Sequence, residues 1–95
     1  LSTDAYEPTE AMKDQTRLRY RECVHPGCHR PARRADVDHI VPWPTGPTTS
    51  ANLAPLCRGH HRLKTHTTWT YTHTPGTGFT WTSPHGRTYE SRQPR

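Results

Sequence analysis

Two pairs of ligand-type side chains constrain this chain more than any other feature of its sequence. Four residues separate Cys23 from Cys28, two separate Cys57 from His60, and twenty-eight lie between the two pairs. Zinc binds four cysteine or histidine ligands in a tetrahedron, usually supplied as two close pairs. The spacing therefore predicts a structural zinc site that closes the intervening segment at its base.

The composition favours such a staple. Hydrophobic residues make up 28% of the chain, against about 45–50% in typical domains. Ten prolines and six glycines favour turns and short elements. A chain of 95 residues with so little apolar material is marginal on burial alone.

The cysteine count also favours zinc. Three is an odd number, so a disulfide such as Cys23–Cys28 would leave Cys57 unpaired. One zinc ion uses all three thiolates together with His60. Thiolate ligands imply a reducing compartment, and we expect a cytoplasmic protein.

The positive charge is concentrated on the ligand-rich region. The net charge is +5, and nine Lys or Arg against three acidic residues lie between Arg17 and Lys64. A basic field suits a polyanion such as nucleic acid, although a merely solvated basic surface is the commoner case. No apolar run is long enough to span a membrane, so no membrane partner is expected. The chain begins at Leu1 without Met, and we expect it to be part of a longer protein with other domains.

The pattern of residues predicts a small α+β fold. We expect a helix that begins with Thr9 as N-cap, a short strand within residues 35–41, and a second helix over residues 58–66. Aromatic residues alternate with threonine on both sides of a Pro-Gly turn at residues 75–78, which predicts a β-hairpin. The expected organisation is a linker or arm (1–8), a core (9–66), a C-terminal hairpin packed on the core (67–90) and a tail (91–95).

A second group of polar residues lies between the two ligand pairs or next to them: Asp38, His39, Asn52 and His61. Neighbouring helical residues point about 100° apart, so His60 and His61 are expected to serve different ions. Asp38 and His61 would leave positions open on a second, catalytic ion, as phosphoester hydrolysis requires. His39 would then be free to act as a general base.

Each of these residues also has a commoner structural role. Asp38 would more often pair with a cation such as Arg34, and Asn52 would more often cap a helix or form a turn. Neighbouring strand residues point to opposite faces, so Asp38 and His39 can share a site only where the strand ends or twists. Pro42 makes an end at this point plausible.

The ordered motifs resemble the HNH endonuclease family, the ββα-metal nucleases, in its zinc-stapled subgroup. His39, Asn52 and His61 match the three letters of the family name. The residues Asp38-His39-Ile40-x-Pro42 resemble its first strand, and Asn52-Leu53-x2-Leu56-Cys57 with His61-x2-Lys64 resembles its second half. The resemblance covers residues 23–64 and implies a ββα-metal core with a structural zinc, to which the residue pattern adds the N-terminal helix and the C-terminal β-hairpin. The Trp-rich end resembles bacterial proteins in which such a module follows a long domain, so a bacterial or phage-encoded source is expected.

The resemblance implies a metal-dependent DNA endonuclease that leaves 5′-phosphate ends, acting on DNA that is double-stranded. His39 would activate the attacking water, and Asp38 with His61 would hold Mg²⁺, Mn²⁺ or another divalent transition metal. Asn52 would brace the loop and orient His39. The candidates for phosphate contacts are Arg33, Arg34, Arg58, Arg62 and Lys64.

The sequence departs from the family at two places. The first ligand pair has four intervening residues where many members have two, and the second pair ends in His60 where many have cysteine. The family's double glycine before the asparagine is here Gly46-Pro47. An exchange of roles between His60 and His61 stays open, as does a non-catalytic zinc module that binds nucleic acid or protein, or a ribonuclease or toxin on the same scaffold.

Overall fold

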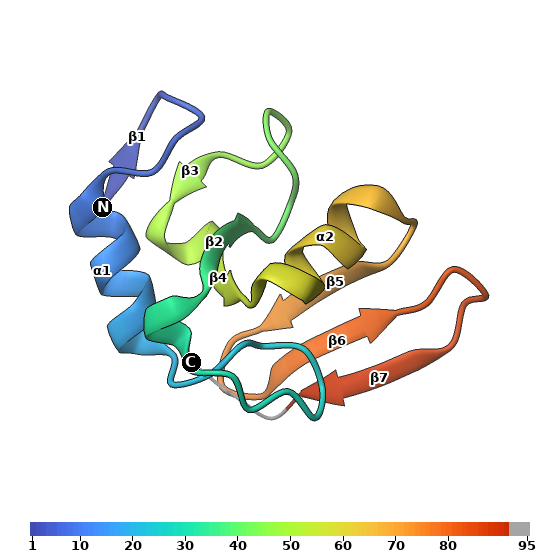
Figure 1. Ribbon diagram of the computed structural model, residues 1–95. Coiled ribbons are helices and arrows are strands. Elements are labelled where there is room, and N and C mark those ends of the chain that lie inside the picture. Colours follow the sequence, from blue (N-terminus) through green and yellow to red (C-terminus); the bar gives the residue numbers. More distant parts are fainter. Residues whose placement is uncertain (92–95) are drawn as a thin grey trace.

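The computed structural model describes residues 1–91, and its centre is a ββα unit. Strand β2 (Asp36–His39) pairs antiparallel with β4 (Leu53–Leu56), so that Asp36 lies opposite Leu56 and His39 opposite Leu53. Helix α2 (Arg58–His66) follows β4 directly and packs against both strands (Figure 1). The predicted second helix is confirmed, and the small α+β fold is the one expected.

Strand β4 was implied by the family resemblance but not predicted by the local residue pattern, for a physical reason. All four of its residues are buried, because α2 and the first helix both pack against it. A strand covered on both faces lacks the alternation that marks a half-exposed strand. Pro55 inside it also argues against a strand, yet proline is tolerated on an edge, and here its carbonyl accepts a hydrogen bond from the Val24 amide at 3.1 Å.

Helix α1 (Glu10–Arg19) begins where the sequence predicts. The Thr9 hydroxyl accepts a hydrogen bond from the Met12 amide at 3.2 Å. The next residue, Tyr20, is extended, and the Cys23 amide then bonds the Arg30 carbonyl at 2.9 Å. The chain therefore leaves the helix early enough to form the loop that carries the first two cysteines.

The C-terminal part is a three-stranded antiparallel sheet of β5 (Thr70–Thr74), β6 (Gly78–Thr82) and β7 (Thr88–Ser91). The hairpin β5–β6 was expected, whereas the third strand was not. Trp81 of β6 is fully buried, and its indole N–H donates to the Val24 carbonyl at 3.0 Å. The sheet therefore packs on the loop after α1, and Trp81 shares one core cluster with Ala54 and Leu56 of β4. Of the tail expected at residues 91–95, Ser91 ends β7, and residues 92–95 lie outside the described part.

The N-terminal arm is part of the fold. Strand β1 (Ser2–Thr3) pairs antiparallel with β3 (Thr48–Thr49), and the Ser50 amide donates to the Leu1 carbonyl at 3.0 Å. Residues 1–8, expected to be a linker or arm, are thus anchored beside the loop that follows β2 (Figure 1). Two single-turn 3-10 helices, Ala32–Arg34 and Ser50–Asn52, lead into β2 and β4.

One hydrophobic core joins these parts. It takes residues from the loop after α1, from the ββα unit and from the C-terminal sheet: Tyr20, Cys23, Val24, Ile40, Ala54, Leu56, Cys57, Tyr71, Phe79 and Trp81. Within residues 1–91, no helix is long and apolar enough to cross a membrane.

Candidate metal centre and active site

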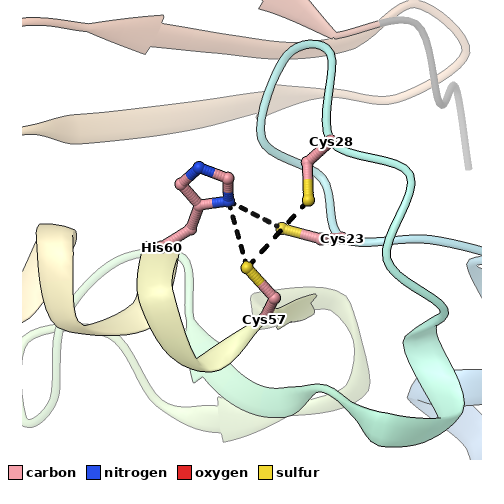
Figure 2. Close-up of side chains that lie close together, drawn as sticks. All are labelled: Cys23, Cys28, Cys57 and His60. Carbon is pink, nitrogen blue, oxygen red and sulfur yellow. Dashed lines mark hydrogen bonds between the residues drawn. The ribbon is translucent and has the colours of Figure 1, made fainter.

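Three cysteines and one histidine converge where α2 begins (Figure 2). Cys23 and Cys28 lie on the loop after α1, Cys57 is the N-cap of α2 and His60 lies in its first turn. Their ligand atoms all lie within 4.8 Å of one another. The Nδ1 atom of His60 is 3.2 Å from the Cys57 sulfur and 3.5 Å from the Cys23 sulfur. A tetrahedral zinc site separates such atoms by about 3.5–3.8 Å, so the donor set fits zinc.

The first cysteine pair is held by a tight turn. The Cys28 amide donates to the His25 carbonyl at 3.1 Å. Gly27 has a φ of +75°, a backbone conformation that a residue with a Cβ rarely adopts. This reversal brings the two sulfurs to the same side of the loop.

The surroundings of the cluster suit a cation. Burial raises the pKa of the Cys23 thiol to about 12, which means that a thiolate there needs a nearby positive charge. Burial lowers the pKa of His60, with smaller contributions from His25 and Arg30, which favours the neutral imidazole that binds metal. The cysteines form no disulfide. These residues could hold a metal ion such as zinc.

The two histidines beside the first cysteine pair behave differently. His29 is exposed and pairs with Glu22 at 3.2 Å. His25 is partly buried, and its ring stacks on His60 with centroids 3.8 Å apart. Trp81 lies edge-on to the same ring at 4.7 Å, so aromatic packing holds His60 toward the sulfurs.

His61 turns away from the cluster toward β2. Its Nδ1 lies 3.0 Å from Oδ2 of Asp36, and its Nε2 lies 3.4 Å from Oδ1 of Asp38. His60 and His61 therefore face different groups, as the helical rotation between neighbours predicts. The geometry brings His60, and not His61, to the three sulfurs.

Asp38 is buried, and its two oxygens have different surroundings. Oδ2 accepts hydrogen bonds from Lys64 Nζ at 2.6 Å and from the Tyr71 hydroxyl at 2.8 Å. Burial and the Asp38 charge raise the pKa of Tyr71, which keeps its hydroxyl protonated as a donor. Oδ1 faces His61 instead. The alternative pairing of Asp38 with Arg34 is replaced by this contact with Lys64.

His39 ends β2 and is 7% exposed. Its Nε2 lies 2.8 Å from the Thr48 hydroxyl oxygen, and that hydroxyl lies 3.2 Å from the Tyr6 carbonyl, to which it donates. Because a hydroxyl has one proton, Thr48 accepts from His39, and Nε2 carries the imidazole proton. Neutral His39 therefore has its lone pair on Nδ1.

Asp38, His39 and His61 line one cavity of about 300 Å³. The strand ends at His39, which removes the conflict between neighbours that point to opposite faces. Burial lowers the pKa of His39; the Asp38 charge opposes this and the Lys64 charge adds to it. The neutral imidazole that a general base requires is therefore favoured.

Asn52 holds the loop that follows His39. Its side-chain amide donates to the carbonyls of Val41 and Pro47 at 3.0 and 2.9 Å, and its Oδ1 accepts from the Val41 amide at 2.9 Å. A Cβ on Gly46 would clash with the Val41 carbonyl, so the loop requires glycine there. Asn52 makes these contacts with the backbone and not with Asp38 or His61.

Asp36 is a residue of the site that the sequence pattern did not single out. Burial opposes its ionisation, but hydrogen bonds from His61 and Arg58 outweigh that effect and lower its pKa. The signal was available, since Asp36 and Asp38 are two apart on a strand and share a face. Thr48, Tyr6 and Tyr71 were also missed, because their contacts with His39 and Asp38 span the fold and leave no local pattern.

The predicted phosphate-binding residues differ in their exposure and in the contacts that they make. Arg33, Arg34 and Arg62 are exposed. Arg58 is also exposed but forms a fork with Asp36, at 3.0 and 3.4 Å. The Lys64 side chain is only 10% exposed and also donates to the His39 carbonyl at 2.6 Å. Lys64 is therefore directed into the site, toward Asp38.

Comparison with known proteins agrees with this geometry. Residues 23–67 match the family described as HNH endonuclease. The chain is 42% identical over 85 residues to the uncharacterized protein Rv3776 of Mycobacterium tuberculosis, and 44% identical over 85 residues to Rv2100 of the same species. Each match covers 88% of this chain.

The chain spans about 16% of the length of these curated relatives. No solved structure matches it. The family assignment therefore depends on residues 23–67, which contain the four cluster residues as well as Asp38, His39, Asn52 and His61. Residues 23–67 thus match a domain of the HNH endonuclease family, and the cluster of three cysteines and one histidine is consistent with a zinc-stapled variant.

Proposed function

We propose that this domain is a metal-dependent DNA endonuclease that hydrolyses phosphodiester bonds, by nicking or by double-strand cleavage. The main support is the cavity that His39 lines together with Asp38 and His61, with the Nε2 atom of His39 bonded to Thr48 and its Nδ1 left as the proton acceptor. The match to a nuclease family adds to it. The basic charge of the chain, +5, suits a phosphate backbone.

His39 acts as the general base in this proposal. Its Nδ1 takes a proton from a water molecule while the water oxygen attacks the phosphorus in line with the leaving 3′ oxygen. The bond from phosphorus to the 3′ oxygen breaks, which leaves a 5′-phosphate, and the released 3′ oxygen takes a proton from solvent water to become a hydroxyl. Thr48 holds Nε2, and therefore keeps Nδ1 as the proton acceptor. Asn52 fixes the loop that carries the residues after His39.

Asp38 Oδ1 and His61 Nε2 would hold the catalytic ion. They lie 3.4 Å apart, a separation that two ligands of one ion at about 2.0–2.2 Å can span. Lys64 and Tyr71 occupy the other oxygen of Asp38 and so direct Oδ1 toward His61. A divalent ion such as Mg²⁺, Mn²⁺ or a later transition metal, when bound, would stabilise the charge that develops on the phosphoryl group and the leaving oxygen.

Asp36 is a positioning residue in this proposal. It accepts from His61 Nδ1, which leaves Nε2 as the metal-binding atom of the neutral ring. A carboxylate behind a metal-binding histidine fixes its tautomer and orientation. Arg58 in turn holds Asp36, so its role as a phosphate contact competes with this ion pair.

The cluster of Cys23, Cys28, Cys57 and His60 holds a structural zinc ion in this proposal. Three thiols that form no disulfide suit a reducing environment, which supports a cytoplasmic location. The second candidate function is a non-catalytic zinc module. It is favoured by one observation, that Lys64 already neutralises one oxygen of Asp38.

Loss of one zinc ligand should unfold the domain. Cys57→Ser removes a thiolate, and a structural zinc site contributes its binding free energy to folding. Elemental analysis should find about one zinc per wild-type chain and none in the variant, and the variant should lose cooperative thermal unfolding. His29→Ala, which removes an exposed histidine outside the cluster, is the control. Retained zinc and unchanged unfolding in Cys57→Ser would contradict the zinc assignment.

Removal of the base should abolish cleavage. His39→Ala is expected to lower the rate of plasmid nicking by about 10²–10⁴-fold, measured on zinc-loaded protein with added Mg²⁺, Mn²⁺ or Ni²⁺. His85→Ala, an exposed histidine near the C-terminal sheet, should cut like the wild type. If wild type cuts neither DNA nor RNA with any ion, or His39→Ala cuts equally well, the non-catalytic zinc module is the better account.

The pH dependence of cleavage should follow His39. Because burial lowers its pKa, the imidazole becomes neutral below the usual value of about 6.5. The protonated ring cannot accept a proton, so kcat/KM should rise with pH through this lowered pKa and be level at neutral pH. An acid limb centred above pH ~7, in a profile corrected for zinc loss, would argue against His39 as the base.

Asp36→Asn should weaken the binding of the catalytic ion. An amide cannot replace the carboxylate behind His61, and loss of such a partner typically costs about 10–100-fold in metal affinity or activity. The concentration of Mn²⁺ that gives half-maximal cleavage should rise by that factor, with zinc content unchanged. Asp14→Asn, an exposed residue of α1, is the matched control. Equal Mn²⁺ dependence in both variants would remove Asp36 from the site.

A further inference from the structure

Two aromatic side chains stand beside the candidate catalytic base and remain open to solvent. Tyr6 is 57% exposed and Trp43 is 36% exposed. The Tyr6 ring stacks on His39, with centroids 5.3 Å apart and planes 21° apart. Trp43 meets the edge of Tyr6 at 6.1 Å and lies 6.1 Å from His39. Both rings line the cavity that contains Asp38, His39 and His61.

Packing does not account for these two rings. The aromatic side chains of the core are at most 4% exposed: Tyr20, Tyr71, Phe79 and Trp81. Tyr6 and Trp43 contribute instead to the wall of an open cavity, and neither belongs to the core cluster. Large aromatic surfaces that stay exposed next to a reaction site favour a ligand-binding role.

Hydrogen bonds fix the backbone segments that carry the two rings. The carbonyl of Tyr6 accepts from Thr48, and β1 pairs with β3 just before it. Trp43 lies in the loop that Asn52 closes by its bonds to Val41 and Pro47. The backbone segments that carry the two rings are therefore ordered before any ligand arrives, which reduces the entropy that binding would cost.

The proposed reaction identifies what would meet these rings. If the scissile phosphate lies at His39, the groups next to it along the strand are a sugar and a nucleobase. Aromatic side chains bind bases of any sequence by stacking on their faces. In a duplex those faces are covered by the neighbouring base pairs, so a ring at the backbone reaches them only when the nucleotide is unpaired.

We propose that Tyr6 and Trp43 form a stacking site for an unpaired nucleobase beside the scissile phosphate. The preferred substrate is then DNA with a single-stranded position at the cut, such as a gap, a bulge or a flap. This proposal rests on the proposed endonuclease function. It replaces the fully paired duplex, which the sequence resemblance implies as the substrate, with DNA that has an unpaired nucleotide at the cut. The acidic residue of the cavity, Asp38, is engaged by Lys64 and Tyr71, so it does not repel the strand as a bare charge.

The test uses the whole zinc-loaded chain with no added divalent ion, so that binding is measured without cleavage. Oligonucleotides carry 2-aminopurine in a single strand, in a matched duplex and at a one-nucleotide bulge. Stacking should quench the fluorescence of the unpaired 2-aminopurine. The measured quantity is the affinity for the bulge divided by the affinity for the matched duplex. This ratio should fall by about tenfold in Tyr6→Ala and in Trp43→Ala, because stacking on one aromatic side chain typically raises affinity by about 5–150-fold.

Two kinds of control separate stacking from general damage. Tyr6→Phe and Trp43→Phe keep an aromatic face and should retain most of the preference for the bulge. Tyr89→Ala removes an aromatic residue of similar exposure, 41%, on β7 and should leave that preference unchanged. Added Mn²⁺ then allows the cut to be mapped, and it should fall next to the unpaired nucleotide.

Different experimental results would contradict the stacking site and the endonuclease function. Absent quenching, an unchanged preference in both alanine variants, or cuts unrelated to the bulge would overturn the stacking site while cleavage that depends on His39 persists. Absence of cleavage on every substrate would overturn the endonuclease function, and with it the placement of the base beside a scissile bond.

Discussion

The position of the whole candidate active site depends on the cluster of three cysteines and one histidine. It joins the loop after α1 to the point where β4 becomes α2, two segments that lie far apart in the sequence. Because His60 faces the sulfurs, the rotation of α2 about its axis is set. The next residue is turned by about 100°, and this directs His61 toward the carboxylates of β2. His60 therefore serves the metal cluster, and its neighbour His61 serves the candidate active site.

A network of charges links the helix to the strand on the other side of His61. His61 and Lys64 are three residues apart and share a face of α2, and both contact Asp38. Tyr71 adds a hydrogen bond from the C-terminal sheet. A buried carboxylate is costly unless it is paired and hydrogen-bonded, and here all of these contacts direct its Oδ1 to His61. The C-terminal sheet is therefore part of the site and not only a cover for the core.

Local patterns in the sequence were sufficient for several features. The spacing of the cysteines and His60 predicted the cluster, the N-cap Thr9 predicted the start of α1, and the Pro-Gly turn predicted the β5–β6 hairpin. The local pattern did not predict strand β4, because burial on both faces removes the alternation of apolar and polar residues. Asp36 was missed although its spacing from Asp38 was visible, because an acidic residue on a strand is more often simply solvated.

The sequence by itself determined the ligand chemistry and the match of residues 23–67 to the family, because residue types at fixed spacing along helices, strands and turns carry that information locally. Tertiary structure decided which atoms meet. Thr48 sets the tautomer of His39, Tyr6 stacks on its ring, and Tyr71 reaches Asp38 across 33 positions of the chain. These contacts depend on how separate elements pack, and no short-range pattern records them.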